Sequence, residues 1–359
     1  MNPSSSMLLL GIGGSGCAIA RGVNRAFGGG MRHLLADTDA ATGRDGEPFV
    51  LIGGDRLSGH GSGGDIVTAR LAAEDSLGSL DDHLDGVRLA VIVTALGGGT
   101  GGGATLEALK HLAGRGVPSL VFATTPFAFE SDMRHRNARG IMPLIEDSAS
   151  SVFFLPLDKL VENAENMEEA MHRALDTVAT GVTFYWRLVE KPGYIRLDAE
   201  RMRHLVSSSG RGRFAAVSAQ GENRVNDALD ALTVSRIIKD GSAPVRRILC
   251  GILAGEDLRL SEVGAIAAGV RKNFGNDSIS PEIATVNDES VFSGRITVVL
   301  MIFESGPDQE SAVRKPVKNV LAISPSGKGR FINAERSEWR GEDLDVPTYL
   351  RQNINLELL

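Results

Sequence analysis

Six of the seven residues from 97 to 103 are glycine, and the exception is Thr100. The stretch follows an apolar run, LAVIVT, and precedes a helical segment, LEALKHLAGRG, at residues 106–116. Consecutive glycines expose their backbone N–H groups, and a helix that follows them adds the positive end of its dipole. The stretch therefore predicts an anion-binding loop between a buried strand and a helix, with the Thr100 hydroxyl in its middle.

Apolar runs of strand length alternate with helical segments throughout the first 160 residues. Strands that are apolar on both faces and alternate with helices are typical of a parallel sheet covered on two sides. Met167, Met171, Leu175 and Val178 then recur at helical spacing, which predicts one long helix that ends before Pro192. The pattern that follows indicates a smaller mixed region, so we expect an α/β fold.

The first glycine cluster along the chain is GIGGSGCA, at residues 11–18. Gly11, Gly13 and Gly16 match the G-x-G-x-x-G pattern, and Asp37 and Asp39 follow a little over twenty residues later. Alone, this fingerprint favours a nicotinamide-dependent oxidoreductase. A dinucleotide site needs no second glycine cradle, however, and no G-K-[ST] of a P-loop follows either cluster. We therefore expect two or more glycine loops to hold the phosphates of one nucleotide.

The composition excludes several other classes of protein. A net charge of −7 argues against binding to nucleic acid. Cys17 and Cys250 form no disulfide framework, which favours a reducing cytoplasm. No apolar window approaches 18 residues and the first apolar run is only strand-length, so we expect neither a signal peptide nor direct membrane insertion. The seven histidines do not cluster with cysteines, so no metal site from protein ligands is expected.

The motif GGGTGGGA resembles the signature loop of the tubulin/FtsZ family, which is most often GGGTG[TS]G. Four further segments resemble this family, and FtsZ, the bacterial cell-division GTPase group, matches them best. They are LLADTDA at 34–40, GHGSGGD at 59–65, TTPFAFESDMRHR at 124–136 and KPGYIRLDAERMR at 191–203. The tail EDLDVPTYLR, residues 342–351, also resembles the C-terminal peptide of the family. The resemblance thus covers nearly the whole chain.

The resemblance implies a tubulin/FtsZ-like architecture, with an N-terminal Rossmann-like nucleotide domain, a central helix and a smaller C-terminal α/β domain. The expected boundaries are 1–166 for the GTP-binding domain, 167–192 for the central helix with the start of the catalytic loop, 193–305 for the C-terminal domain, 306–340 for a flexible linker and 341–359 for a partner-binding peptide. It also implies binding of GTP or GDP, Mg²⁺ carried with the phosphates, and head-to-tail homopolymers. The expected location is the cytoplasm, at the division site.

The resemblance assigns GTP binding to the glycine loops, to the segment at 124–136 and to the central helix. Within this set, Glu130 is expected at the ribose, Arg134 near the nucleotide and Asp176 at the base. The full set is Gly13, Gly14, Ser15, Gly16, Cys17, Ala18, Asp39, Gly61, Gly98, Gly99, Thr100, Gly101, Gly102, Glu130, Arg134, Leu175 and Asp176.

The loop after the central helix departs from the family pattern. Members usually carry N-x-D-x-x-D there, and the carboxylates polarise the water that attacks the nucleotide of the neighbouring subunit. This chain has Arg196, Asp198 and Arg201 at those positions, with Glu200 one position away. Because arginine stays protonated, Arg201 cannot act as a base, but it can pair with a terminal phosphate. The candidate catalytic residues are therefore Asp198, Arg201 and Glu200, and slow hydrolysis is expected.

The expected base-reading positions have also changed. Ala18 and Leu175 stand where members usually place asparagines, and neither side chain can hydrogen-bond a base. Each lost polar contact on a buried base edge costs about 1–3 kcal/mol, so we expect weaker affinity or looser selectivity for GTP. Three interpretations of the protein's function therefore remain: a hydrolysing division GTPase, a poorly hydrolysing filament scaffold and, remotely, the nicotinamide-dependent oxidoreductase.

The tail combines acidic residues, a proline and spaced apolar residues. Such a segment can fold into a groove on a partner, although a frayed amphipathic end is the plain alternative. The resemblance implies docking to membrane tethers of the FtsA or ZipA kind and to division regulators. The predicted partner-binding residues are Leu344, Asp345, Val346, Pro347, Tyr349 and Leu350.

Overall fold

The computed structural model of the chain describes residues 6–161, 164–207, 210–239, 244–275, 279–304, 338–339 and 342–343. Contacts divide the chain into two units, Met1–Pro307 and Asp308–Leu359. In the second unit, strands β11 (Glu338–Trp339) and β12 (Glu342–Asp343) pair antiparallel. The rest of the predicted linker and peptide, including every predicted partner-binding residue, lies outside the described residues.

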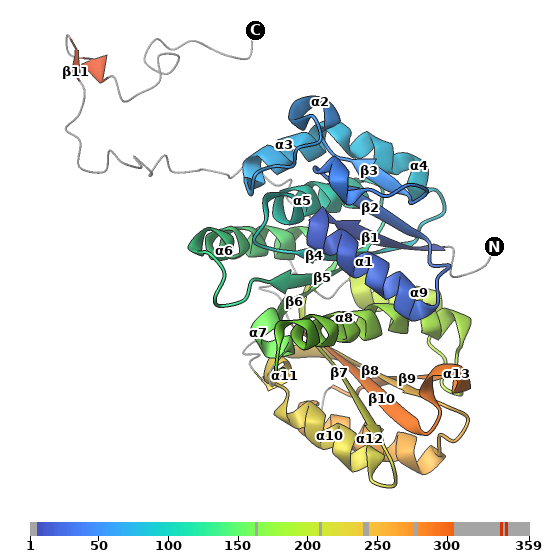
Figure 1. Cartoon of the computed structure of the whole chain (residues 1–359). Coiled ribbons are helices and arrows are strands. Elements are labelled where there is room, and N and C mark those ends of the chain that lie inside the picture. The colour runs from blue at the N-terminus through green and yellow to red at the C-terminus, as the bar shows by residue number, and fades with distance from the viewer. Residues whose placement is uncertain are drawn as a thin grey trace. The chain divides into compact units, whose positions relative to one another are not determined.

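The first unit is built on a ten-stranded sheet with the strand order β3-β2-β1-β4-β5-β6-β7-β10-β8-β9 (Figure 1). From β3 to β7 all neighbours are parallel, and β9 is parallel to β8. Only β10 runs antiparallel to its neighbours, β7 and β8. The strands are β1 Met7–Ile12, β2 His33–Asp37, β3 Phe49–Leu51, β4 Leu89–Ala95, β5 Ser119–Thr125, β6 Ser151–Pro156, β7 Gly210–Gln220, β8 Val245–Ala254, β9 Glu282–Asn287 and β10 Arg295–Glu304.

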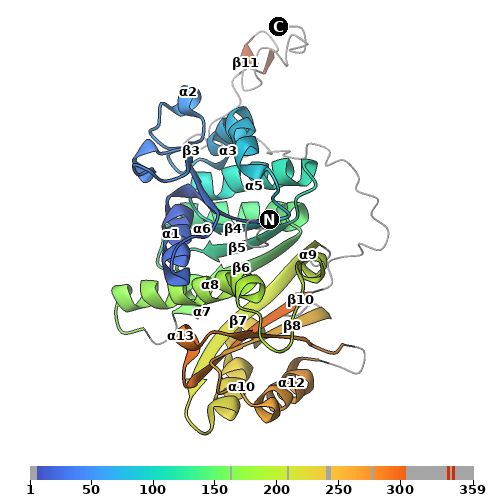
Figure 2. The same cartoon turned by 90° about the vertical axis from the view of Figure 1, so that its right-hand side faces the viewer.

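Helices cover both faces of the sheet, as Figures 1 and 2 show. They are α1 Gly13–Phe27, α2 Gly54–Leu57, α3 Ile66–Ser76, α4 Asp81–Leu84, α5 Gly99–Gly114, α6 Asp132–Ser148, α7 Leu157–Leu160, α8 Met167–Glu190, α9 Ala199–Ser207, α10 Arg224–Val234, α11 Arg236–Lys239, α12 Leu260–Phe274 and α13 Glu289–Phe292. Among the described residues, none of these helices has the length and apolarity that a membrane span requires.

Three apolar cores hold the layers together. The first joins α1, α8 and α9 to one face of the sheet and extends from β2 to β9. The second lies under α5 and α6 on the opposite face of the N-terminal strands. The third lies between β7, β8 and β10 and the helices α10 and α12, which Figure 2 shows side by side below the sheet. The predicted α/β fold is therefore confirmed.

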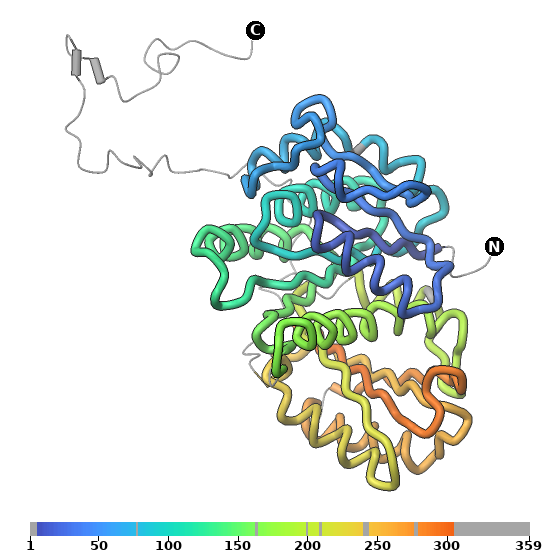
Figure 3. Tube along the Cα trace, viewed as in Figure 1, coloured from blue at the N-terminus to red at the C-terminus, as the bar shows by residue number. Residues whose placement is uncertain are grey.

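The long central helix is present as predicted, and its start has a local cause. The Asn166 side chain accepts a hydrogen bond from the Glu169 backbone N–H at 2.9 Å, which caps α8. Two acidic residues, Glu168 and Glu169, occupy the first turn, where the helix dipole favours negative charge. The helix ends at Glu190, two residues before Pro192, and the tube in Figure 3 shows the chain then turning toward α9.

Candidate nucleotide site

Helix α5 begins inside the glycine stretch, at Gly99, although the sequence predicted a loop reaching residue 105. A Cβ on Gly99 would overlap the carbonyl oxygen of Asp65, and one on Gly101 would overlap that of Ala95. Gly98, at the N-cap, differs, because no described residue beyond its chain neighbours has an atom within 4 Å of its Cβ position. Most of these glycines therefore allow α5 to pack closely against its neighbours. The space beside Gly98, by contrast, holds no atom of another described residue.

Helix α1 begins at Gly13, inside the glycine cluster GIGGSGCA. Its φ of +77° is a conformation that glycine adopts readily, and a Cβ there would lie 3.0 Å from the Gly101 nitrogen. The first turns of α1 and α5 therefore meet, and the first N–H groups of a helix have no partner within it. Gly14 and Ser15 are exposed at this point. Two helix N-termini close together suit a phosphate group.

The Thr100 hydroxyl already has protein partners in the structure. It lies 2.7 Å from the Thr38 hydroxyl and 3.4 Å from the Ser62 hydroxyl, and the residue is buried. These contacts join the glycine loop at residues 97–103 to the end of β2 and to the glycine loop at residues 59–65. The Thr100 hydroxyl thus connects three segments of the site.

Asn137, which the sequence analysis missed, connects two of the glycine loops. Its side-chain amide donates to the carbonyl oxygens of Gly64 at 2.9 Å and of Gly97 at 3.0 Å. The residue lies on α6, within a charged segment that has no recognisable motif, so no sequence signal marks it. Through Asn137, the position of α6 sets the distance between the glycine loops at residues 59–65 and 97–103.

A cavity of about 360 Å³ opens between α1, α7, α8, the start of α6 and the ends of β4 and β5. This volume is in the range of small-molecule sites. Five predicted GTP-binding residues line it, namely Ser15, Ala18, Glu130, Arg134 and Leu175. The remaining predicted residues lie outside the lining: Gly13, Gly14, Gly16, Cys17, Asp39, Gly61, Gly98, Gly99, Thr100, Gly101, Gly102 and Asp176.

Glu130 and Arg134 form an ion pair at the edge of the cavity. An Arg134 N–H donates to Glu130 Oε2 at 2.7 Å, and the Phe127 backbone N–H donates to Glu130 Oε1 at 2.9 Å. Glu130 is the more buried of the two, while more than half of the Arg134 side chain is exposed. The pair therefore presents a fixed carboxylate and a movable cation, which suit a ribose and a phosphate, respectively.

Helix α8 forms one wall of the cavity. Leu175 lies on this wall and packs against α1 so closely that a Cβ on Gly22 would be 2.7 Å from it. Asp176, the predicted base contact, is exposed and is not among the residues that line the cavity, although it lies one turn beyond His172 on the same side of the helix. Two polar residues of α8, Glu168 and His172, also line this wall, and no sequence motif marked them as site residues.

Cys17 contributes no side chain to the cavity. Its thiol faces the carbonyl oxygens of Gly11 and Ala36, and burial raises the pKa of this thiol to about 12. The thiol therefore stays protonated at neutral pH and is no nucleophile. No group of three or more His, Cys, Asp or Glu side chains in the described part of the chain could hold a metal ion.

The three predicted catalytic residues follow α8 and lie outside the cavity of their own chain. Asp198 Oδ1 accepts from the Arg201 backbone N–H at 2.7 Å and so caps α9. The Arg201 guanidinium donates twice to Glu282, at 2.8 and 3.0 Å. Glu200 pairs with Arg203 at 3.1 Å and with a second arginine that precedes β4. Each of these charges thus already has a partner within the chain.

The segment before Asp198 is attached to the edge strand β9. The Gly193 N–H donates to the Thr285 carbonyl at 2.8 Å, and the Thr285 N–H donates to the Ile195 carbonyl at 2.9 Å. A side chain on Gly193 would overlap Thr285 and Asn287. These contacts fix the path of the loop, so that Tyr194 is 79% exposed.

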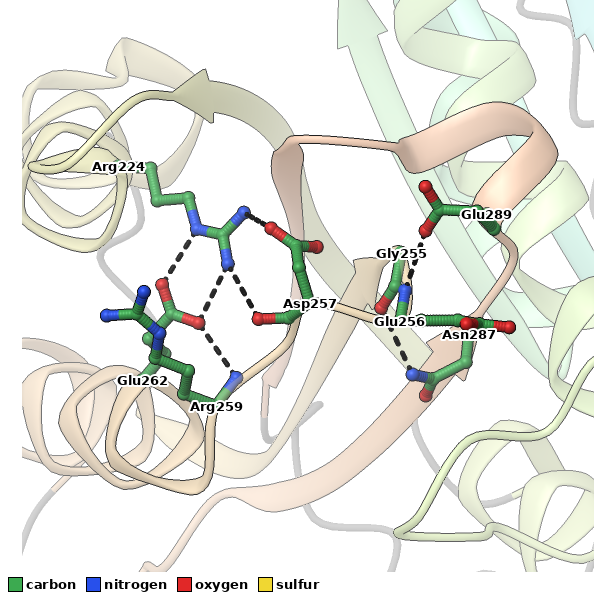
Figure 4. Close-up of polar contacts among 8 residues, drawn as sticks. All are labelled: Arg224, Gly255, Glu256, Asp257, Arg259, Glu262, Asn287 and Glu289. Carbon is green, nitrogen blue, oxygen red and sulfur yellow. Dashed lines mark hydrogen bonds and ion pairs between the residues drawn. The ribbon is translucent and has the colours of Figure 1, made fainter.

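A polar network lies at the end of β9 and along the loop that follows β8 (Figure 4). The Asn287 amide donates to the Gly255 carbonyl at 3.2 Å. The Glu289 carboxylate accepts from the Glu256 backbone N–H at 2.8 Å. Farther along the same loop, Arg224 lies between Asp257 and Glu262, with contacts of 2.5 to 2.8 Å. The loop that follows β8 is thereby held to α10, α12 and the end of β9.

Comparisons with known proteins agree with this geometry. The GTPase domain of the Tubulin/FtsZ family matches residues 6–165. A cell division protein FtsZ from Coxiella burnetii is 27% identical, over 97% of this chain and 89% of the relative. Another from Wigglesworthia glossinidia brevipalpis is 26% identical, over 97% of this chain and 96% of the relative.

Solved structures share the fold. An empty FtsZ dimer from M. jannaschii has a TM-score of 0.73 at 22% identity, over 83% of this chain and 88% of that one. A GTPγS-bound protofilament of CetZ2 from Haloferax volcanii has a TM-score of 0.69 at 22% identity, over 85% of this chain and 94% of that one. With its glycine-lined helix starts, its central helix and these matches, the chain belongs to the tubulin/FtsZ family.

Proposed function

We propose that this protein is an FtsZ-like cytoskeletal GTPase, which binds GTP, polymerises head to tail and acts at the division septum of a bacterial cell. The observation that carries the proposal is the cavity beside two converging helix N-termini, within a GTPase-domain match. The similarity to proteins named cell division protein FtsZ extends over nearly the whole chain, which supports the same role for the whole protein.

The cavity suggests how the nucleotide lies. The phosphates are placed at the open backbone of Gly14, Ser15 and Gly98, where the α1 and α5 dipoles favour negative charge. The ribose is placed beside Glu130 and Arg134, and the base against α8. Mg²⁺ would bind to the phosphate oxygens and neutralise part of their charge.

Exposed apolar side chains at two distant places support head-to-tail assembly. Near the cavity, 70% of Phe129 and 47% of Met133 are exposed. On the loop after α8, 79% of Tyr194 and 38% of Ile195 are exposed. Two different apolar patches on one subunit form a heterologous contact that repeats without closing, and this makes a filament. A solved dimer and a protofilament of related proteins support this arrangement.

Slow hydrolysis follows from the loop after α8. Asp198 is the one carboxylate at a family catalytic position, and it already accepts the bond that caps α9. Arg201 is held by Glu282 and cannot accept a proton from water. The second candidate function is therefore a filament scaffold in which GTP is bound but hardly cleaved.

The C-terminal peptide, residues 341–359, is proposed to dock onto FtsA- or ZipA-like membrane tethers and division regulators. Its acidic and apolar sequence suits a segment that folds on binding. In this proposal the filament works in the cytoplasm and is attached to the membrane only through such partners.

The test is sedimentation of polymers with GTP or GDP, run together with phosphate release. The variants are Asp198→Asn, which retains the helix cap, and Arg201→Asp combined with Glu282→Gln, which avoids two facing carboxylates. We expect the wild type to pellet only with GTP and to release little phosphate, and the double variant to release more. Glu282→Gln alone is the matched control. Failure to pellet with GTP would refute the filament, and fast turnover that Asp198→Asn leaves unchanged would refute the catalytic assignment.

A further inference from the structure

Asp37 places a buried carboxylate beside the first turn of α1. The residue ends β2, and only 4% of its surface is exposed. A Cβ on Gly14 would lie 3.6 Å from Asp37 Oδ2, and Gly14 belongs to the backbone at which the phosphates are proposed to bind. Helix α1 has no acidic residue in its own first turn. The strand β2 thus brings a negative charge to the helix start that would also receive the nucleotide phosphates.

The Asp37 carboxylate is fixed in this position. Its Oδ1 accepts from the Thr38 backbone N–H at 2.8 Å, and its Oδ2 accepts from the Thr42 hydroxyl at 2.6 Å. Thr42 is held in turn, because the Arg21 guanidinium donates to its backbone carbonyl at 2.6 Å. The carboxylate therefore cannot turn away from α1 without breaking these contacts when a ligand approaches.

The charge of Asp37 is not cancelled by an ion pair. Arg21, the first basic residue of α1, pairs with Glu47 at 2.7 Å instead. Within the described part of the chain, no arginine, lysine or histidine forms an ion pair with Asp37. Burial, and after it the Asp37 charge, raise the pKa of the Cys17 thiol on α1 to about 12. The negative charge of Asp37 is therefore felt at the start of α1.

A nucleotide brings further negative charge to the same place. Like charges that approach closely in a partly buried site repel each other strongly. Mg²⁺ bound to the phosphates cancels part of their charge, and carboxylate oxygens are among the ligands that it prefers, so Asp37 suits a metal-bound phosphate chain. We propose that Asp37 acts as a charge filter, which repels the metal-free nucleotide and admits its Mg²⁺ complex. This inference rests on the proposed function, in which the cavity binds a nucleoside triphosphate.

A purely structural role for Asp37 makes a different prediction. In that role the carboxylate only holds the loop after β2, through Thr38 and Thr42. Asp37→Asn separates the two roles, because the amide oxygen still accepts from the Thr38 N–H and the amide nitrogen can donate to the Thr42 hydroxyl. The variant loses the charge and keeps the loop contacts. A charge filter predicts that mainly the affinity for metal-free nucleotide changes.

The test is calorimetric binding of GTP to the nucleotide-free full chain, once with Mg²⁺ and once with EDTA in its place. We expect the wild type to bind GTP at least about tenfold more weakly in EDTA. Asp37→Asn should bind metal-free GTP about tenfold more tightly than the wild type does, and the Mg²⁺ complex within about threefold of it. Asp45→Asn makes the same charge change at an exposed position of the following loop and should alter neither affinity.

Four results would overturn the inference, and they are distinguishable. If the wild type binds GTP equally well with and without Mg²⁺, the site has no filter. If Asp37→Asn keeps the wild-type ratio of the two affinities, the filter is not the Asp37 charge. Equal losses of affinity in both conditions, together with a lower melting temperature, would assign Asp37 a structural role. If the wild type binds no GTP in either condition, the proposed function fails, and the inference fails with it.

Discussion

Two glycines of the same motif have opposite environments. A Cβ on Gly101 would overlap the carbonyl oxygen of Ala95, whereas the Cβ position of Gly98 faces open space among the described residues. The sequence predicted that the two glycine clusters lie where a buried strand meets the helix that follows it, and the structure places them there. It could not separate glycines needed for packing from those that face a ligand, since both look alike in the chain.

This difference predicts opposite results for one substitution. Gly101→Ala should destabilise the protein by about 1–3 kcal/mol or more, because the added methyl group has no room beside the end of β4. Gly98→Ala should cost less than about 1 kcal/mol, since its φ of −80° suits alanine. Urea unfolding of the two variants measures the difference. Equal losses of stability would show that α5 is not packed as described.

At the scale of elements, α8 was predictable and its neighbours less so. Apolar residues at helical spacing gave its position almost to the residue. Strand β7 escaped prediction because its exposed and buried positions are mixed and it contains two arginines. The connection between α6 and the glycine loops depends on Asn137, whose partners lie 40 and 73 residues away in the sequence.

Asn137 should therefore matter for binding more than for folding. Asn137→Ala removes both donors to the glycine-loop carbonyls, and two lost hydrogen bonds predict GTP affinity that is lower by roughly three- to tenfold. The melting temperature should change little, because Asn137 lies outside the apolar cores. Arg139→Ala, also on α6, is the control. A drop in stability with unchanged affinity would assign Asn137 a purely structural role.

At the scale of the molecule, α8 joins the nucleotide half to the C-terminal half. Arg187 donates to Asp288 at 2.8 Å, and both side chains are 7% exposed. The same guanidinium lies 5.4 Å from the ring centres of Phe27 and Phe292. One residue thus contacts α1, the turn after β9 and α13. Because a buried charge needs its partner, this contact ties α8 to the turn after β9.

The proposed function requires that the cavity holds a guanine nucleotide and no dinucleotide. Calorimetric titration of GTP and, separately, of NAD⁺ into the nucleotide-free full chain with Mg²⁺ present tests this requirement. We expect one GTP bound per chain and no heat of binding with NAD⁺. Saturable binding of NAD⁺ without binding of GTP would contradict it and would restore the oxidoreductase interpretation of the first glycine cluster.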